Sequence, residues 1–217
     1  MPNSQIKSKK RVIDYGEVFT LQKEVDNMVN LVNQEVLRLD SRFLEPACGT
    51  GNFLIEIYNR KLLLVKKKFL KDKYLFEFNS VVATSSIYGI ELLYDNTIVC
   101  RERLFELFKE VYLSLFPSSF NQNCLNTVKY ILGKNIINAN ALTLKQENKN
   151  KTPIVFSEWS PVNKTYIQRR DFTFENLLSS ADINSLPLFS DAGENIYIPK
   201  PLKSYDLKYF LELSNDK

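Results

Sequence analysis

Two glycines and a carboxylate lie close together in residues 43–54, which read FLEPACGTGNFL. An apolar run leads into the glycines and a helical pattern of apolar residues follows them, which predicts a strand, a turn and a helix. Gly49 and Gly51 allow a ligand to approach the backbone closely, and the start of the helix offers free N–H groups. Glu45 would repel a pyrophosphate and attract an ammonium group, so we predict a ligand with a positive charge. The segment also lacks the GxGxxG and GK[ST] patterns of nucleotide-phosphate sites.

Histidine is absent from the 217 residues, which excludes several kinds of chemistry. Imidazole-based acid–base catalysis, Ser–His and Cys–His nucleophiles and most zinc sites all need it, so we expect no metal centre. Cys48, Cys100 and Cys124 are widely spaced, which favours a reducing cytoplasm over a disulfide framework. Residues 1–11 lack the apolar core of a secretory signal, and no apolar run is long enough to span a membrane. The net charge of +4 permits nucleic-acid binding without demonstrating it.

The whole string in residues 43–54 closely resembles the first motif of the gamma-class N6-adenine DNA methyltransferases of type I and type IIG restriction–modification systems. Read as a bare pair of glycines, the segment would be only a tight turn. The resemblance implies that the chain binds S-adenosylmethionine at this turn. The implied contacts from this motif are Glu45, Pro46, Ala47, Cys48, Gly49, Gly51, Asn52 and Phe53.

Three further segments resemble motifs of the same family and occur in the family's order. Residues 16–20 resemble the preceding motif, which implies that Phe19 and Thr20 lie near the methionine part of the cofactor. Residues 89–91 resemble the second-strand motif, which implies that Glu91 binds the ribose hydroxyls, with Leu92 beside it. An amphipathic surface helix and a solvated strand end are the alternative interpretations of these two segments.

Residues 138–142 resemble the third-strand motif, with Asn140 at the position of the family's aspartate. The resemblance implies that Asn140 accepts a hydrogen bond from the adenine amino group, without the assistance of a charge, and that Ala141 and Leu142 line the site. The alternative is an ordinary loop asparagine.

The family's fourth motif, a polar residue followed by Pro-Pro and an aromatic residue, has no counterpart, because the sequence contains no Pro-Pro pair. That motif holds the flipped target base. Ser157, Glu158 and Trp159 are weak candidates for an unorthodox catalytic group, although a buried tryptophan beside a surface acid is the favoured interpretation. Arg169 and Arg170 can contact phosphate or be solvated turn residues.

Strand and helix patterns alternate along the chain. We expect helices in residues 16–33, 52–73, 95–115 and 126–132, and strands in residues 42–47, 86–92, 134–138 and 153–159. This order predicts an α/β protein with a mostly parallel sheet flanked by helices, of the Rossmann-like class I methyltransferase type that the resemblance implies. Whether that sheet is complete stays open. We expect a cofactor-binding domain in residues 1–160 and a carboxyl-terminal extension in residues 161–217.

These patterns lead to a functional expectation with two rivals. The expected function is that of an S-adenosylmethionine-dependent DNA adenine-N6 methyltransferase, or of its cofactor-binding subunit, in a restriction–modification system. This is the first of three hypotheses. DNA and a second methyltransferase or specificity subunit with the missing motif would be its partners. The second is a non-catalytic protein that binds the cofactor or a partner. The third is methylation of RNA, protein or a small molecule through residues 157–159.

Overall fold

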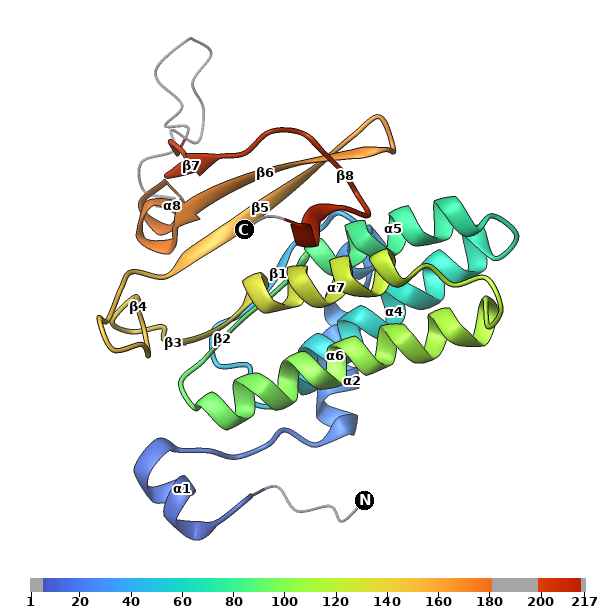
Figure 1. The fold of residues 1–217 in the computed structure, drawn as a ribbon. Coiled ribbons are helices and arrows are strands. Elements are labelled where there is room, and N and C mark those ends of the chain that lie inside the picture. Colours follow the sequence, from blue (N-terminus) through green and yellow to red (C-terminus); the bar gives the residue numbers. More distant parts are fainter. Residues whose placement is uncertain (1–5, 181–198, 216–217) are drawn as a thin grey trace, which may run out of the picture.

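The computed structural model describes residues 6–180 and 199–215, and its elements form one helical layer, one short parallel sheet and one antiparallel sheet (Figure 1). The architecture is mixed α/β, as the alternating patterns predict. Among the described residues, no helix is both long enough and apolar enough to cross a membrane.

The parallel sheet consists of β1 (Phe43–Glu45), β2 (Ile87–Glu91) and β3 (Ile136–Asn140), in that spatial order. The short strand β4 (Lys145–Gln146) pairs with β3 in the antiparallel sense. Glu45 is in register with Gly89, and Glu91 is in register with Asn138. The carboxyl ends of the three parallel strands therefore lie at one edge of the sheet, where open α/β sheets bind ligands.

Helices connect these strands and cover them. Each helix of the central group has an apolar stripe that packs on the strands or on its neighbours, and β2 is buried along its whole length. The helices are α1 (Lys9–Tyr15), α2 (Gln22–Leu31), α3 (Asn33–Val36), α4 (Asn52–Phe69), α5 (Lys73–Ser85), α6 (Tyr94–Leu115), α7 (Gln122–Asn135) and α8 (Phe174–Ser180).

The second sheet corrects the expectation of a mostly parallel arrangement. The predicted fourth strand is β5 (Val155–Val162), which pairs with β6 (Tyr166–Thr173) as an antiparallel hairpin and does not join β1–β3. The reason is local, because Asn163 and Lys164 in the connecting turn both have φ of 53° and reverse the chain. The strands β7 (Lys203–Ser204) and β8 (Lys208–Tyr209) also pair with β6, and a 3-10 turn, Leu213–Asn215, follows.

Two helix starts also differ from the sequence patterns. The helix α2 begins at Gln22 and not at residue 16. The helix α6 begins at Tyr94, one residue before the expected start. Thr20, Asp95 and Asn96 make contacts within the site, which are described below.

Two buried hydrogen bonds join the antiparallel sheet to the helical layer and to the parallel sheet. The Trp159 Nε1–H group donates to Asn135 Oδ1 over 2.9 Å, and the Tyr88 hydroxyl donates to the Ser157 carbonyl over 2.8 Å. Residue 160, where we expected a division between domains, lies inside β5. Residues from both sheets belong to one continuous hydrophobic core.

Candidate functional site

The turn that follows β1 is held by one backbone hydrogen bond to β2 and one within the turn. Cys48 N–H donates to the Ile90 carbonyl over 2.9 Å, and Gly51 N–H donates to the Cys48 carbonyl over 2.8 Å. The helix α4 starts directly afterwards at Asn52, so its amino terminus lies at the carboxyl edge of the sheet. This is the strand–turn–helix unit that the glycine spacing predicts.

The two glycines of the turn are needed for different reasons. Gly49 and Gly51 have φ of 53° and 89°, the left-handed region that favours glycine. A Cβ on Gly51 would also lie 2.6 Å from Cys100 Sγ, on α6. A Cβ on Gly49 would meet only the Phe19 ring at 3.8 Å, an ordinary contact. Gly51 therefore permits the packing of α6 on the turn, whereas Gly49 provides the turn conformation.

Glu91 connects the turn to the end of β2. One carboxylate oxygen accepts a hydrogen bond from Gly49 N–H over 2.7 Å, and the other accepts from Leu93 N–H over 2.8 Å. A carboxylate can accept about four hydrogen bonds, so acceptor sites remain for a ligand. The side chain is almost fully buried, with 7% exposure. Glu91 thus positions the turn, and the ribose contact that the resemblance implies stays a prediction.

Phe19 and Thr20, the two predicted cofactor contacts from residues 16–20, lie against the glycine turn. Asn52 Nδ2 donates to the Thr20 carbonyl over 3.1 Å, and the Phe19 ring lies against Gly49. The structure therefore brings Phe19 and Thr20 together with the glycine turn, although about thirty residues separate them along the chain.

Charged residues that the sequence patterns did not single out fasten this amino-terminal segment to α6. Arg11 forms ion pairs with Glu17 at 2.5 Å and with Asp95 at 2.8 Å, and Lys7 pairs with Asp95 at 2.9 Å. The Arg11 and Lys7 partners hold the pKa of Asp95 below its ordinary value. Asn96 Nδ2 donates to Glu17 over 2.6 Å. In the sequence, the only indication of these ion pairs is that the paired residues carry opposite charges.

Arg103, on α6, is a further residue that the sequence patterns did not predict, and its side chain is hydrogen-bonded to the turn. Its guanidinium donates to the Thr50 carbonyl over 2.6 Å and to Asn52 Oδ1 over 2.9 Å. Cys48 and Cys100 contact each other beneath the turn, and this contact together with burial raises the pKa of Cys48. Cys48 is therefore a neutral packing group and not an activated nucleophile.

The third-strand asparagines have distinct roles. Asn138 Nδ2 donates to the Glu91 and Leu92 carbonyls, both over 2.9 Å, and so ties β3 to the end of β2. Asn140 Oδ1 accepts from Leu142 N–H over 2.9 Å and from Thr143 N–H over 3.1 Å. The oxygen of Asn140 is thus occupied by its own loop, and its NH₂ group is the part left for a ligand.

The other predicted cofactor contacts lie along the same edge with different exposure. Pro46, Ala47, Leu92 and Leu142 are exposed, while Glu45, Phe53 and Ala141 are half-buried. Glu45 and Phe53 also border a cavity of about 370 Å³ beside β1.

The weak catalytic candidates are engaged elsewhere, in β5. Ser157 donates to Asp171 over 2.7 Å, and Trp159 is buried against Asn135. Glu158 forms ion pairs with Arg42 at 2.7 Å and with Arg170 at 2.6 Å. Arg169 is also buried, and it pairs with Asp171 at 2.7 Å. Trp159 is therefore buried as we expected, whereas Glu158 is a half-buried acid paired with two arginines and not a surface acid.

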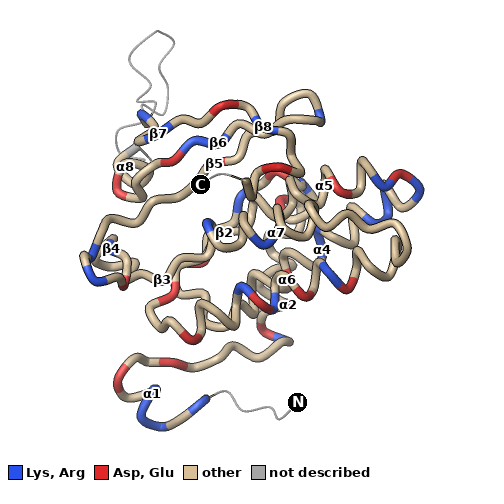
Figure 2. The backbone as a smooth tube through the Cα atoms, in the orientation of Figure 1, with Lys and Arg blue, Asp and Glu red and all other residues tan. Residues whose placement is uncertain are grey.

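The two basic regions of the chain lie far apart. Lys7 and Arg11 are near the start of α6, whereas Lys66–Lys68 and Lys71 lie where α4 ends and α5 begins (Figure 2). The helix α4 has 18 residues, which corresponds to about 27 Å between this lysine-rich end and the glycine turn. Of these two basic regions, the amino-terminal one therefore adjoins the site.

The chain is an α/β protein whose glycine turn lies at the carboxyl edge of a short parallel sheet. The family model for the DNA-methyltransferase domain of MmeI matches residues 21–166, which is more than half of the chain. The chain therefore belongs to this family of restriction–modification DNA-methyltransferase domains. Searches of curated proteins and of solved structures returned no match.

Proposed function

We propose that this chain binds S-adenosylmethionine at the glycine turn and acts as the cofactor-binding part of a DNA adenine-N6 methyltransferase. One observation carries the proposal: segments that are distant in the sequence meet at one edge of the parallel sheet, around Gly49 and Glu91, in a member of a DNA-methyltransferase family. We also propose that β1–β3 and their helices belong to a Rossmann-like class I methyltransferase arrangement.

In the proposal, each part of the cofactor is assigned to a chemical group at the edge of the sheet. In the proposal, Glu45 pairs with the ammonium of the methionine part, and the Phe19 and Thr20 segment covers that part. The free acceptor positions of Glu91 take the ribose hydroxyls, and Asn140 faces the adenine ring. Bound at this edge, S-adenosylmethionine would supply an activated methyl group.

The remaining requirement is a group that holds the target base. In the proposal, the chain positions the methyl donor, and a partner polypeptide with the polar-Pro-Pro-aromatic motif orients the adenine amino group for in-line attack. DNA is then the substrate. The rate would come from positioning, with no covalent intermediate on this chain.

A second candidate function is non-catalytic binding of the cofactor or of a partner subunit. The absence of a Pro-Pro pair from the sequence favours it. The two candidates differ in one observable property: only the first predicts methyl transfer to adenine-containing duplex DNA when a chain with the Asn-Pro-Pro-Tyr sequence is added.

Calorimetric titration of S-adenosylmethionine tests the proposal directly. We expect binding in the micromolar range, corresponding to about −8 kcal/mol, and a loss of at least about tenfold in Glu45→Ala. Glu91→Gln should also weaken binding, while keeping one acceptor for the turn. Glu102→Ala, which removes an exposed acid on α6, is the matched control and should bind as the wild type does.

Two results would contradict the proposal. One is a folded wild-type chain, verified by circular dichroism, that shows no heat of binding. The other is equal weakening by Glu45→Ala and by Glu102→Ala, since this would show a general charge effect.

A further inference from the structure

The strand β1 has one unpaired edge. It pairs with β2 on one side and stands last in the strand order, and the described residues place no other strand beside it. Phe43 N–H donates to the Ser86 carbonyl over 2.9 Å, toward β2. Because alternate residues of a strand direct their backbone groups to opposite sides, the N–H and C=O groups of Leu44 point toward the open edge. This edge is a template for strand addition.

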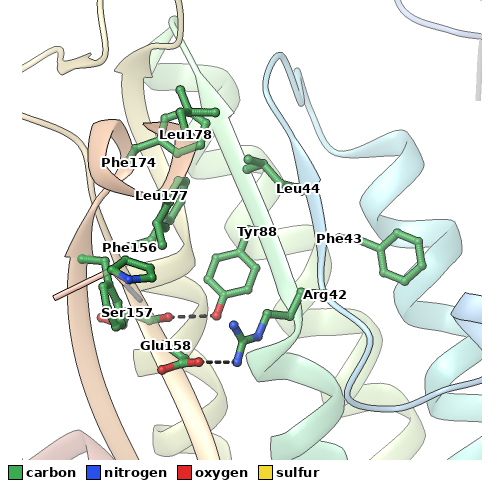
Figure 3. A pocket seen from close by; sticks show the side chains of 12 residues that line it. Arg42, Phe43, Leu44, Tyr88, Phe156, Ser157, Glu158, Phe174, Leu177 and Leu178 are labelled. Atoms are coloured by element: carbon green, nitrogen blue, oxygen red, sulfur yellow. Dashed lines mark hydrogen bonds and ion pairs between the residues drawn. The ribbon is translucent and has the colours of Figure 1, made fainter. Parts of the chain in front are cut away.

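A cavity lies on one face of the sheet at this edge. It has a volume of about 410 Å³ and is lined mainly by apolar side chains of β1, β2, β5, β6 and α8. In Figure 3, Leu44 and Tyr88 face Phe156 and Leu177 across this cavity, while Phe43 points away from it. The cavity would accept an apolar side chain placed on this face.

A second cavity lies on the opposite face, against α2 and α4. It has a volume of about 370 Å³, and its lining includes Met28, Val29, Phe53 and Ile57. Phe43 and Leu44 border both cavities. The two cavities therefore meet at β1, one on each side of the sheet.

This pairing of cavities matches the geometry of a β-strand. Successive side chains of a strand point to opposite faces of a sheet, so a strand added beside β1 would fill both cavities in turn. Such a strand must be apolar on both faces, as buried parallel strands are. The cavity linings agree with this, because Met28, Val32, Leu44 and Leu178 are exposed to 55%, 44%, 41% and 45%.

Charge at the edge is confined to its two ends. Arg42 at the start of β1 already pairs with Glu158 at 2.7 Å, as Figure 3 shows, and Glu45 lies at the other end, beside the glycine turn. A strand parallel to β1 would end at Glu45, so the residues after it would arrive at the proposed cofactor site. An antiparallel strand would deliver them to the opposite edge of the sheet.

We propose that the open edge of β1 binds a strand of a second polypeptide, apolar on both faces and parallel to β1, which carries the target-base motif at its carboxyl end. The inference rests on the proposed function for the role of that motif. The docking itself depends only on the edge and the two cavities.

The test uses the full chain with a tethered probe strand. A segment of about five valine and isoleucine residues followed by Asn-Pro-Pro-Tyr is fused to the carboxyl terminus through a flexible Gly/Ser linker, which gives an effective concentration in the millimolar range. The control fusion has the same composition with a proline at the centre of the apolar run, which interrupts strand pairing. Amide hydrogen exchange is followed by nuclear magnetic resonance, residue by residue.

We expect the probe strand to slow the exchange of the Leu44 amide by at least about tenfold, since this N–H gains an acceptor. The Phe43 amide, already bonded to Ser86, should not change. In Leu44→Lys, which puts a charge at the edge, the backbone amide at the substituted position should exchange equally fast with and without the probe strand. Leu63→Lys, on the outer face of α4 where Leu63 is 52% exposed, is the matched control and should keep the protection of Leu44.

Equal exchange of Leu44 in the probe and control fusions would overturn the docking proposal. A second result would also overturn it. If Leu44 were protected in the unfused chain, and this protection disappeared when residues 181–198 were replaced by a Gly/Ser segment of equal length, residues 181–198 would be the occupant of the edge. Calorimetry with S-adenosylmethionine on the same samples separates the two ideas. Binding without protection removes only the docking proposal, and protection without binding removes only the proposed function.

Discussion

The hydrogen bonds of the Asn140 side-chain oxygen determine which of its groups can still bind a ligand. Its oxygen accepts two backbone N–H groups of its own loop, so its NH₂ group is the part that could still bind a ligand. An aspartate at this position could keep both loop bonds with one oxygen and accept a hydrogen bond from the adenine amino group with the other.

We therefore predict that Asn140→Asp raises the affinity for S-adenosylmethionine by about tenfold, because a charge-assisted hydrogen bond replaces a mismatched donor. Calorimetric titration measures the change. Asn126→Asp, which adds the same charge on the exposed side of α7, should leave the affinity unchanged. Lower affinity in Asn140→Asp would show that the NH₂ group itself binds the ligand.

Gly51 provides a second prediction at the scale of a residue. Gly51→Ala places a Cβ 2.6 Å from Cys100 Sγ and forces alanine into a φ of 89°. We expect a loss of about 2–4 kcal/mol in the free energy of unfolding, from backbone strain and overpacking together. Chemical denaturation measures it.

Gly133→Ala is the control for that substitution. Nothing lies within 4 Å of the added Cβ, and Gly133 is inside α7. This change should stabilise the chain by about 0.5–1 kcal/mol. If both alanine variants were equally stable, the close packing of α6 on the turn would be wrong.

At the scale of elements, Lys61 fixes α4 to the segment that leads into β1. Its buried ammonium donates to the Arg38, Leu39 and Ser41 carbonyls and to the Ser86 hydroxyl, over 2.6–3.1 Å. Burial lowers the pKa of Lys61 from its ordinary value of 10.5 to about 7. The folded chain therefore releases this proton at a lower pH than the unfolded chain does.

This difference predicts how stability depends on pH. Between the folded pKa near 7 and the unfolded value of 10.5, the unfolded chain binds more protons, so raising the pH favours the folded state. Relative to Lys61→Met, the wild type should gain about 2 kcal/mol in the free energy of unfolding between pH 7 and pH 9. Urea denaturation at both pH values measures the difference, and parallel pH profiles for the two chains would contradict it.

At the scale of the whole molecule, the two sheets should unfold together because they share one core. Trp159 is the only tryptophan and lies in the antiparallel sheet, so its fluorescence reports on that sheet. Far-ultraviolet circular dichroism reports mainly on the helices. We predict that the two signals give the same denaturation curve. A fluorescence transition at lower denaturant would mean that the antiparallel sheet unfolds separately.

Asn135 is the residue through which that coupling can be weakened. Its side chain accepts from Trp159 Nε1–H and donates to the carbonyls of Ser85, at the end of α5, and Ile87, at the start of β2. Asn135→Ala should lower the free energy of unfolding by about 2–4 kcal/mol and shift the Trp159 emission to longer wavelength. Asn123→Ala, at an exposed position of the same helix, should change neither.

The sequence by itself determined the local geometry of the site. The glycine spacing of residues 49–51 predicted the turn, and the apolar patterns predicted the helices α2, α4, α6 and α7 and the strands β1, β2 and β3. These features depend on the conformational freedom of single residues and on periodicity along the chain, both of which can be read from neighbouring positions. The helix α5, which is buried along much of its length, was not predicted.

Only the tertiary structure decided the pairings between distant residues. These are the antiparallel partner of β5, the ion pairs of Lys7 and Arg11 with α6, the occupied oxygen of Asn140 and the open edge of β1. Each depends on strand register, chain direction or the orientation of a side chain after the core has formed. Composition and local spacing do not encode those quantities, because residues far apart in the sequence acquire them only when they pack together.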